Sequence, residues 1–454
     1  MQKLGLILIA TILGSCATAP RVVSKPSSSR TVVFFLIDGL SIATLTEQMT
    51  QNRAPAIKNY FSGSNSHFSY AHTSFPSMTF PAIGSLLTEK PISTNGIFGN
   101  RIINEKNQII DFESPSHFID YNKMIEGKNV FARLQQKNET AVSFAYAINA
   151  DTIPVIASKN LGAGLAILNR SYEAVDDELI DGLQKLLTTK KPEDWPHFIF
   201  IHLIGVDFTA HEQGSRSKAV AIYLKNLDQK LAPIFQTLLN AEKSKQRQII
   251  SMLSADHGFD ETHKRTVLFD ELILKKNPEI RLLNEGRYAG LYFPKNLDSE
   301  QRLSILKSFL KNTNIDLIAL RDQKNIFVQS ASQEVMMMTL PATCANGNFA
   351  LSIIQQKGGL TQPNASPWTC PENITGRLSQ TFYPYFLSNL SYYFHAEQAP
   401  DAIVVARSGV SLKLGYEALH GGPTARETLI PLLLRNSQVE SDRIPAIWEL
   451  LRFL

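Results

Sequence analysis

Acidic and histidine residues stand directly after three short apolar runs in the sequence. Asp38 follows VVFFLI, Asp207 and His211 follow FIFIHLIGV, and Asp256 and His257 follow IISMLSA. In an open α/β sheet the carboxyl ends of the strands face one crevice, so groups that are far apart in the sequence can meet there. Asp207 and His211 are four residues apart, which places both side chains on one face of a helical turn. We therefore expect a site at one edge of a sheet.

A further histidine, His420, lies in a turn-forming His-Gly-Gly segment near the end of the printed sequence. With it the chain offers three carboxylates and three imidazoles, a mixture of oxygen and nitrogen ligands that suits a pair of zinc ions. Taken singly, each residue could be a helix cap, a salt-bridge partner or a core histidine. Their joint placement after strand-like runs favours a metal site. The candidate ligands are Asp38, Asp207, His211, Asp256, His257 and His420.

A hydroxyl residue in a separate segment is the candidate nucleophile. Thr79 precedes an apolar stretch, residues 80–87, that can form a helix with Pro81 in its first turn. A hydroxyl at a helix N-terminus faces unpaired backbone N–H groups and the positive end of the helix dipole, which favours anion binding and a lowered hydroxyl pKa. The alternative is that Thr79 only caps the helix.

The elements that would position these groups follow from the apolar pattern. Runs rich in β-branched and aromatic residues predict buried parallel strands at residues 31–37, 142–147, 198–204, 249–254 and 402–406. Their order predicts an α/β fold, a three-layer α/β/α sandwich with a central, mostly parallel sheet. Helical spacing predicts an amphipathic helix over residues 217–239, which Pro233 interrupts. A second helix is expected at 299–311, between short strands near 288–293 and 316–320.

Composition bounds the class of protein. The 454 residues are 44% hydrophobic and 19% charged, enough for one large or two ordinary cores, which excludes a disordered chain. The formal net charge of +4 comes without a long basic block, so there is no nucleic-acid-binding signature. Residues 328–393 are richer in Asn, Gln, Ser, Thr and Pro, and we expect a loop-rich insert there, within a core of residues 31–327 and 394–454. The oligomeric state stays open.

The first twenty residues have the order of a secretory signal: Lys3, an apolar run over residues 4–13, and small residues up to Cys16. The run is shorter than the roughly 20 apolar residues of a membrane span. The letters LGSC at residues 13–16 resemble a bacterial lipobox, which implies a signal peptide over residues 1–15 and a lipid-modified Cys16 that anchors the protein to a membrane. The alternative is an ordinary cleaved signal in which Cys16 is incidental.

The residues that follow predict where the protein lies. Ala17, directly after the cysteine, is typical of outer-membrane sorting among bacterial lipoproteins, so we expect the cell envelope, with the fold facing the periplasm. Residues 16–30 are polar and rich in Ser and Pro, which predicts a flexible tether. In that oxidising compartment Cys344 and Cys370 could form a disulfide, and two unpaired buried thiols are the alternative.

The motifs, in this order, resemble those of the alkaline phosphatase superfamily, and within it the type I phosphodiesterase and nucleotide pyrophosphatase branch. The likeness runs from about residue 32 to residue 434 and is thin over residues 328–393. It adds a segment, GIFGN, that closes on Asn100. The matching motifs are Asp38-Gly39, Thr79-Phe80-Pro81, Asn100, Asp207 with His211, Asp256-His257-Gly258 and His420-Gly421.

This resemblance implies a metal-dependent hydrolase with two zinc ions, other divalent metals being possible. One ion would be held by Asp207, His211 and His420, and the other by Asp38, Asp256, His257 and the Thr79 oxygen. Thr79 would attack phosphorus and form a phospho-threonine intermediate, which water then hydrolyses. The Asn100 side chain and the backbone N–H of Phe80 would hold a non-bridging oxygen. The Phe80 ring matches a position that stacks on a nucleotide base, and a plain core role fits it equally well.

The same resemblance bears on the substrate. Monoesterases of the superfamily usually add an Arg or Lys that offsets the second charge of the phosphate. The corresponding region, residues 145–154, contains no cation, although Lys90 or Arg101 could supply one. A diester carries a single charge, so we expect a phosphate diester or a nucleotide-type small molecule. The alternatives are a phosphomonoesterase or phosphonate hydrolase on the same site, and a surface lipoprotein that binds its ligand without turnover.

Overall fold

The computed structural model describes residues 30–63, 65–145, 171–265, 277–323, 325–330, 334–343, 349–357, 383, 385–437 and 444–452. The predictions for the signal peptide, the tether, Cys16, Cys344 and Cys370, and for most of residues 145–154, lie outside these residues. Within them, no helix is both long and apolar enough to cross a membrane.

The centre of the fold is a six-stranded sheet. In spatial order its strands are β2 (Ser66–His72), β19 (Leu429–Arg435), β7 (Gln248–Ser254), β1 (Arg30–Ile37), β6 (Phe198–Leu203) and β5 (Ala141–Phe144). β1 pairs in parallel with β6 and β7, and β5 pairs in parallel with β6. β19 runs antiparallel to both of its neighbours. The prediction of an α/β fold with a central, mostly parallel sheet is confirmed.

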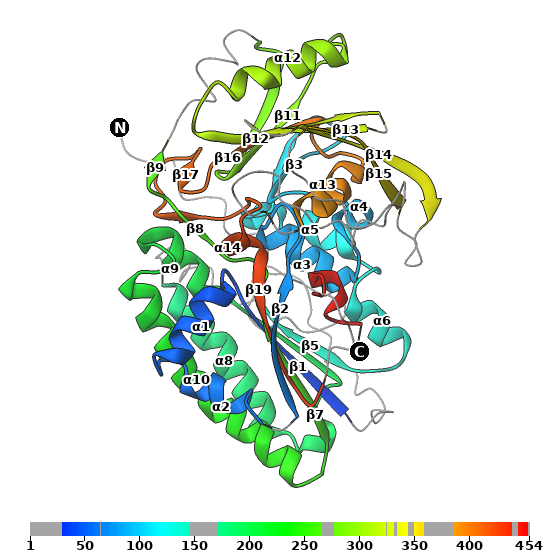
Figure 1. Cartoon of the computed structure of the whole chain (residues 1–454). Helices are drawn as coiled ribbons and strands as arrows, with labels where there is room; N and C mark the ends of the chain where they lie inside the picture. The colour runs from blue at the N-terminus through cyan, green and yellow to red at the C-terminus, as the bar shows by residue number, and fades with distance from the viewer. Residues whose placement is uncertain are drawn as a thin grey trace, which may run out of the picture.

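Helices cover both faces of this sheet, which explains why its inner strands read as continuous apolar runs. In β1 every residue from Val32 to Ile37 is buried. Figure 1 shows two layers of helices, one on each side of the sheet. The first layer is α1 (Ile42–Thr50), α2 (Pro55–Tyr60), α8 (Tyr172–Thr189), α9 (Gly205–Gln213) and α10 (Lys218–Lys243). The second includes α3 (Thr79–Thr88), α4 (Ile92–Asn95), α5 (Phe118–Ile125) and α6 (Val130–Gln136).

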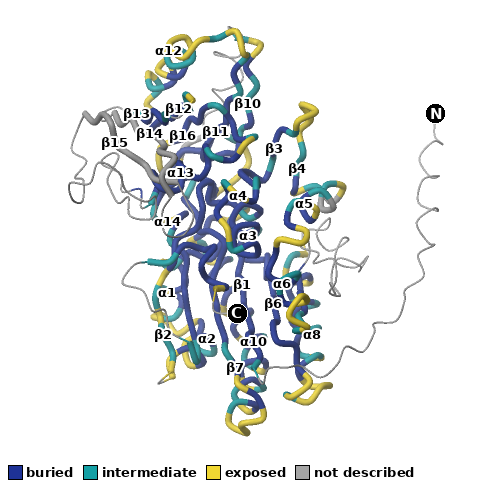
Figure 2. The backbone as a smooth tube through the Cα atoms, turned by 90° about the vertical axis from the view of Figure 1, so that its right-hand side faces the viewer, coloured by how far each residue is buried: buried dark blue, intermediate teal, exposed yellow. Residues whose placement is uncertain are grey.

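The predicted amphipathic helix is α10, which the Ser217 side chain caps by accepting from the N–H of Val220. It continues through Pro233 to Lys243, so the proline does not end it. Its apolar positions face the sheet and its neighbouring helices. Figure 2 shows the same division across the molecule, with burial concentrated in the central strands and exposed residues on outer helices and loop ends.

A second, antiparallel sheet of seven strands lies beyond the central one. Its strands are β10 (Arg281–Asn284), β11 (Tyr288–Tyr292), β16 (Ala402–Ala406), β12 (Ile315–Asp322), β13 (Asn325–Ser330), β14 (Glu334–Thr343) and β15 (Phe349–Lys357). The predicted second helix is α12 (Ser299–Phe309), which begins with a capping box between Asp298 and Gln301 and packs on β12.

This second sheet corrects two expectations. The run 402–406 is a strand, as predicted, but it pairs antiparallel with β11 and β12 instead of joining the central sheet. The stretch 328–393 is not loop-rich where it is described, because it contains the end of β13, all of β14 and β15, and α13 (Phe386–His395). The domain boundaries themselves stay a prediction.

Short elements complete the described chain. The remaining strands are β3 (Arg101–Ile103), β4 (Ile109–Asp111), β8 (Asp260–Glu261), β9 (Lys264–Arg265), β17 (Val410–Ser411) and β18 (Ala418–Leu419). The helix α14 (Ala425–Thr428) and three 3₁₀ turns, at Pro115–His117, Pro192–Asp194 and Ile447–Glu449, are equally short. Several of them, β3, β4, β8, β18 and α14, border the site described next.

Candidate metal centre and nucleophile

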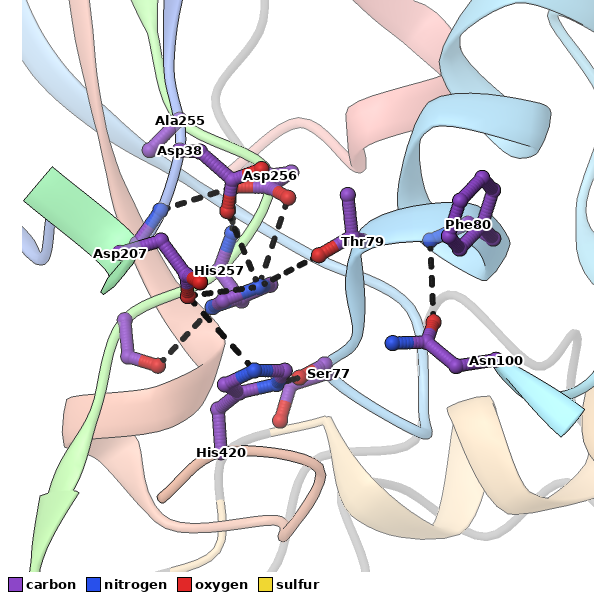
Figure 3. Close-up of polar contacts among 12 residues, drawn as sticks. Asp38, Ser77, Thr79, Phe80, Asn100, Asp207, Ala255, Asp256, His257 and His420 are labelled. Atoms are coloured by element: carbon purple, nitrogen blue, oxygen red, sulfur yellow. Dashed lines mark hydrogen bonds and ion pairs between the residues drawn. The ribbon is translucent and has the colours of Figure 1, made fainter. Parts of the chain in front are cut away.

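The six candidate ligands meet at the carboxyl edge of the central sheet, and Figure 3 shows five of them, Asp38, Asp207, Asp256, His257 and His420. Asp38 follows β1, and Asp256 and His257 follow β7. Asp207 and His211 lie on α9, which begins directly after β6, and His420 follows β18. Two sets of three ligand atoms each converge within 4.8 Å: Asp207, His257 and His420, and Asp38, Asp256 and His257.

The first half of the site contains the predicted trio of Asp207, His211 and His420. The Nε2 atoms of His211 and His420 are 3.1 Å apart. Asp207 Oδ2 lies 3.6 Å from His211 Nε2, and Asp207 Oδ1 lies 3.6 Å from His420 Nε2. The i, i+4 spacing on α9 therefore places both of its ligands at one point, as predicted.

The second half centres on His257. Its Nε2 atom lies 3.4 Å from Asp38 Oδ1, 3.4 Å from Asp256 Oδ2 and 3.2 Å from the Thr79 hydroxyl. Asp207 Oδ1 is 3.9 Å from the same nitrogen, so the two halves adjoin. The predicted set of Asp38, Asp256 and His257 therefore converges as a group. In the other half the converging group is Asp207, His257 and His420, and His211 lies beside it through its 3.1 Å contact with His420.

Backbone carbonyls orient all three ligand histidines. Nδ1 lies 3.0 Å from the Ala418 carbonyl in His211, 3.2 Å from that of Gly258 in His257, and 3.1 Å from that of Ser77 in His420. A proton on Nδ1 satisfies each carbonyl and leaves the Nε2 lone pair directed into the site, as in metal-binding histidines. Burial lowers the pKa of His211 to about 3, and it lowers the pKa of His257 and, far more, of His420, so the rings are neutral.

The carboxylates are short of partners. One buried oxygen each of Asp38, Asp207 and Asp256 has no hydrogen-bond partner among the described residues. Burial, with the charge of Asp256 next in effect, raises the pKa of both Asp38 and Asp207 well above their usual range. Three crowded acids beside neutral imidazoles need positive charge, and this donor set fits divalent metal ions of the zinc type.

Two glycines let the backbone pass close to the ligands. Gly39 follows Asp38 with φ +71°, and a Cβ there would come within 3.0 Å of the Asp207 Cα atom. At Gly258, a Cβ would lie 2.1 Å from the Arg426 carbonyl oxygen. These contacts explain why glycine follows the acid in one motif and the histidine in the other.

Thr79 is the first residue of α3, after the N-cap Met78. Because Met78 occupies the N-cap position and Thr79 lies inside the helix, the alternative of a plain N-cap is not observed. The hydroxyl instead contacts His257, and the side chain is partly exposed among buried neighbours. The position leaves Thr79 accessible to a substrate, at the N-terminal end of a helix.

Asn100 lies beside the start of the same helix. Its Oδ1 accepts from the Phe80 backbone N–H at 3.2 Å, and its Nδ2 donates to Glu113 Oε1 at 2.8 Å. Figure 3 shows Asn100 with its oxygen toward the Phe80 N–H. The Phe80 ring is 6% exposed and packs edge-on against Tyr121, with centroids 4.8 Å apart. Of the two roles left open for the ring, the core role describes its place in this structure.

Residues that the sequence did not single out hold the ligands in position. His202, within β6, lies beside Leu36 in register and donates from Nε2 to Asp38 Oδ2 at 2.8 Å. Burial lowers the pKa of His202 to about 4, so this histidine is neutral. The sequence feature that could have identified His202 is its place as the histidine in an otherwise apolar strand, FIFIHL.

Asp176 on α8 accepts from the N–H groups of Ile204 and Gly205 at the start of α9, at 2.8 and 3.1 Å, and from the Tyr223 hydroxyl at 2.8 Å. Ser77 accepts from the Gly421 N–H with its hydroxyl oxygen and so joins the His420 loop to the segment before Thr79. Nothing in the local sequence around Asp176 or Ser77 predicts these roles, because each partner lies far along the chain.

The chain is similar to a known protein family in sequence and to solved structures in fold. A family model described as "Type I phosphodiesterase / nucleotide pyrophosphatase" matches residues 32–334. Phosphonoacetate hydrolase from Sinorhizobium meliloti 1021, in complex with phosphonoformate, has a similar structure with a TM-score of 0.59 and 13% identity, over 94% of this chain and 95% of that one.

An inactive variant of murine ectonucleotide pyrophosphatase/phosphodiesterase 5, in complex with AMP, is similar with a TM-score of 0.59 and 13% identity, over 94% of each chain. At such identities the likeness shows the fold. No curated protein matches the sequence.

Proposed function

The chain belongs to the type I phosphodiesterase/nucleotide pyrophosphatase family of the alkaline phosphatase superfamily, and from this we propose that it is a two-metal phosphodiesterase or nucleotide pyrophosphatase with Thr79 as its nucleophile. Family membership supports a phosphoester hydrolase. The observation that carries the finer proposal is the position of the Thr79 hydroxyl, partly exposed and 3.2 Å from His257 Nε2, at the edge of two adjoining clusters of acids and histidines.

Each residue has a distinct role in this proposal. Thr79 Oγ1 attacks phosphorus, the leaving-group oxygen departs on the opposite side, and water then cleaves the phospho-threonine to restore the hydroxyl. Asn100 Nδ2 would stabilise charge on a non-bridging oxygen, and the Phe80 N–H at the start of α3, which in this structure donates to Asn100 Oδ1, would share its hydrogen with that oxygen. Asp207, His211 and His420 would hold one metal, and Asp38, Asp256 and His257 the other. The bound metals, proposed to be zinc, supply charge stabilisation of the attacking and leaving oxygens.

A phosphodiester or a nucleotide is the proposed substrate class, in line with the AMP complex of the murine relative. The alternative, a phosphomonoesterase or phosphonate hydrolase, draws on two cations near the site. Arg101 directly follows Asn100, and the charge of Lys413, after burial and the neighbouring histidines, helps to lower the pKa of His211 and of His420. Both cations face Glu285, at 3.0 and 3.9 Å, which already offers them a counter-charge.

The test compares two substrates on one protein. A zinc-loaded protein that lacks residues 1–15 is assayed with a bis(nitrophenyl) phosphate diester and with nitrophenyl phosphate. We expect a higher kcat/KM for the diester, and a loss of about 10³-fold or more for both in Thr79→Ala. Thr94→Ala, which changes an exposed threonine on α4, is the matched control.

A large monoester preference would favour the alternative substrate class. Full hydrolysis by Thr79→Ala would contradict the role of Thr79 as the nucleophile. Activity in protein that contains no zinc would contradict the proposed requirement for this metal. Binding of phosphate without turnover of either ester would favour the non-catalytic lipoprotein.

We also propose that Cys16 carries the lipid anchor and that the protein faces the periplasm from the outer membrane. The support is the LGSC tetrad and the Ala17 that follows it. In a Gram-negative host, the full-length protein is expected in the outer-membrane fraction, and Cys16→Ala is expected to lose the lipid. If the full-length protein and Cys16→Ala differed in mass only by the substitution and appeared equally in the outer-membrane fraction, the proposed lipid anchor would be contradicted.

A further inference from the structure

Glu113 lies next to Asn100, in the turn after β4, and its side chain is exposed. Its Oε1 accepts from Asn100 Nδ2 at 2.8 Å, and its own backbone N–H donates to Asp111 Oδ1 at 3.0 Å. The turn therefore holds a carboxylate directly on the amide that the proposed function assigns to the phosphoryl oxygen.

The charge of Glu113 reaches across the site. After burial and Asp256, it is the next contribution that raises the pKa of Asp207, one of the metal ligands. After burial, it is the largest contribution that raises the pKa of Tyr416, whose ring lies 5.1 Å from that of His211. A phosphoryl group between Thr79 and Asn100 would lie within this field.

We propose that Glu113 selects the charge of the substrate: it orients Asn100 by accepting one of its amide hydrogens, and it disfavours a phosphoryl group that carries a second negative charge. This inference rests on the proposed function and narrows it to monoanionic substrates, such as phosphodiesters or monoesters of phosphonates.

The physical basis has two parts. An amide has two hydrogens, and the bond to Glu113 holds one of them, so the other points in a fixed direction. A diester leaves one charge on the phosphoryl group, whereas a monoester loses its second proton near a pH of about 6 and then carries two. Each added charge is repelled by the carboxylate. At about 4 Å this repulsion amounts to roughly fivefold in affinity in bulk water and to more at the lower dielectric of a protein surface, so we expect an effect of at least about tenfold.

The neighbouring cations do not reverse this effect, because each has a carboxylate partner. Arg101 Nε lies 3.0 Å from Glu285 Oε1, and Arg101 also donates to the Asn284 carbonyl. Lys413 Nζ is 3.9 Å from Glu285 Oε2. Glu113 is the acid that bonds to the phosphoryl-binding amide itself.

The first experiment measures the ratio of kcat/KM for a bis(nitrophenyl) diester to that for nitrophenyl phosphate, in the zinc-loaded protein at about pH 6 and about pH 8. Glu113→Gln keeps an oxygen acceptor for Asn100 but removes the charge. We expect it to lower the diester-to-monoester ratio about tenfold at the higher pH and by less at the lower. Glu126→Gln, an exposed acid on the segment after α5, is the matched control and should leave the ratio unchanged.

Glu113→Ala separates orientation from charge. It should shift the ratio as Glu113→Gln does, and it should also lower kcat on both esters at least about fivefold relative to Glu113→Gln, since Asn100 then loses its acceptor. Equal kcat values in the two variants would overturn the orienting role, and an unchanged ratio in Glu113→Gln would overturn charge selection.

A binding measurement keeps this inference separate from the proposed function. Inorganic phosphate is titrated calorimetrically into zinc-loaded Thr79→Ala, with and without Glu113→Gln. We expect the second change to tighten binding about tenfold at pH of about 8. If neither ester is hydrolysed by the unsubstituted protein, the proposed function fails, yet the phosphate affinities still decide the role of Glu113: equal affinities overturn it.

Discussion

At the scale of single residues, the site depends on groups that orient the ligands as much as on the ligands. Three histidines hydrogen-bond through Nδ1 to backbone carbonyls, and one carboxylate oxygen of Asp38 accepts a hydrogen bond from His202. In each case one atom is held so that the other faces the centre. Such supporting contacts typically change metal affinity or activity by 10- to 100-fold when they are removed.

His202 offers a direct test of this support. His202→Leu removes the donor to Asp38 Oδ2 inside a buried strand, and we expect zinc affinity to fall about 10- to 100-fold, as measured by competition with a chelator. His202→Gln places an amide N–H close to the former Nε2 position and is expected to retain most of the affinity. If both variants bind zinc as tightly as the unsubstituted protein, His202 only fills space.

The candidate ligands could be singled out from the sequence because each stands directly after an apolar run or in a glycine-containing motif. His202 and Glu113 could not, since their partners are set by strand register and by a turn. Leu36 and His202 are neighbours only because β1 and β6 pair in that register. The exposed Glu113 looks like any solvated acid until the β3–β4 hairpin brings it to Asn100.

At the scale of elements, the start of α9 is the most constrained point near the site. A Cβ on Gly205 would lie 1.8 Å from the Tyr223 hydroxyl oxygen, so Gly205→Ala must displace the tyrosine that bonds to Asp176. We expect a loss of about 1–3 kcal/mol in the free energy of unfolding and weaker zinc binding, measured by urea denaturation and chelator competition.

A double-mutant cycle checks whether displacement of Tyr223 causes the loss of stability in Gly205→Ala. In a Tyr223→Ala background the steric conflict is absent, so Gly205→Ala should cost far less there. Equal costs in the two backgrounds would show that the loss arises elsewhere in α9.

Asp176 gives the same helix a dependence on pH. Burial raises the pKa of Asp176 from 3.8 to about 7 in the folded protein, so the folded state binds a proton that the unfolded chain releases near pH 4. Its contribution to stability is therefore full below pH of about 4 and declines as the pH rises to about 7. The difference in free energy of unfolding between the unsubstituted protein and Asp176→Asn should shrink over that range, and a constant difference would contradict the shifted pKa.

The apolar pattern of the sequence predicted where several strands lie, but it did not predict which sheet each strand joins. The runs at 31–37, 198–204 and 249–254 lie in the central sheet as expected. The run at 402–406 has the same buried, β-branched character, and nothing in that character tells which sheet it joins. The average polar composition of 328–393 obscured β14 and β15, although their own sequences, EVMMMTLPAT and FALSIIQQK, are largely apolar, because most polar residues of this stretch lie outside the two strands.

At the scale of the whole molecule, the metal centre connects the strands β1 and β7 with α9 and with the loop of His420. Removing divalent metal leaves three crowded carboxylates without counter-charge, so a chelator is expected to lower the melting temperature, and added zinc to restore it. Metal at about 100 times its Kd contributes about 2.7 kcal/mol to stability.

Asp207→Asn sharpens this prediction. It removes one like charge, so it should stabilise the metal-free protein and destabilise the loaded one, relative to the unsubstituted protein in each state. The same sign in both states would contradict the account of the site as a cluster of acids that requires metal.

The place of β19 has a consequence for how the chain is made. Residues 429–435 insert between β2, which comes from residues 66–72, and β7, and β2 hydrogen-bonds to the sheet through them. During synthesis, β7 therefore has an open edge, and β2 lacks its sheet partner, until residue 435 has left the ribosome. Open apolar edges invite pairing with other chains. A nascent chain that stalls just before residue 429 thus contains the candidate ligands yet stays exposed to aggregation, and β19 is the described strand that closes this gap in the sheet.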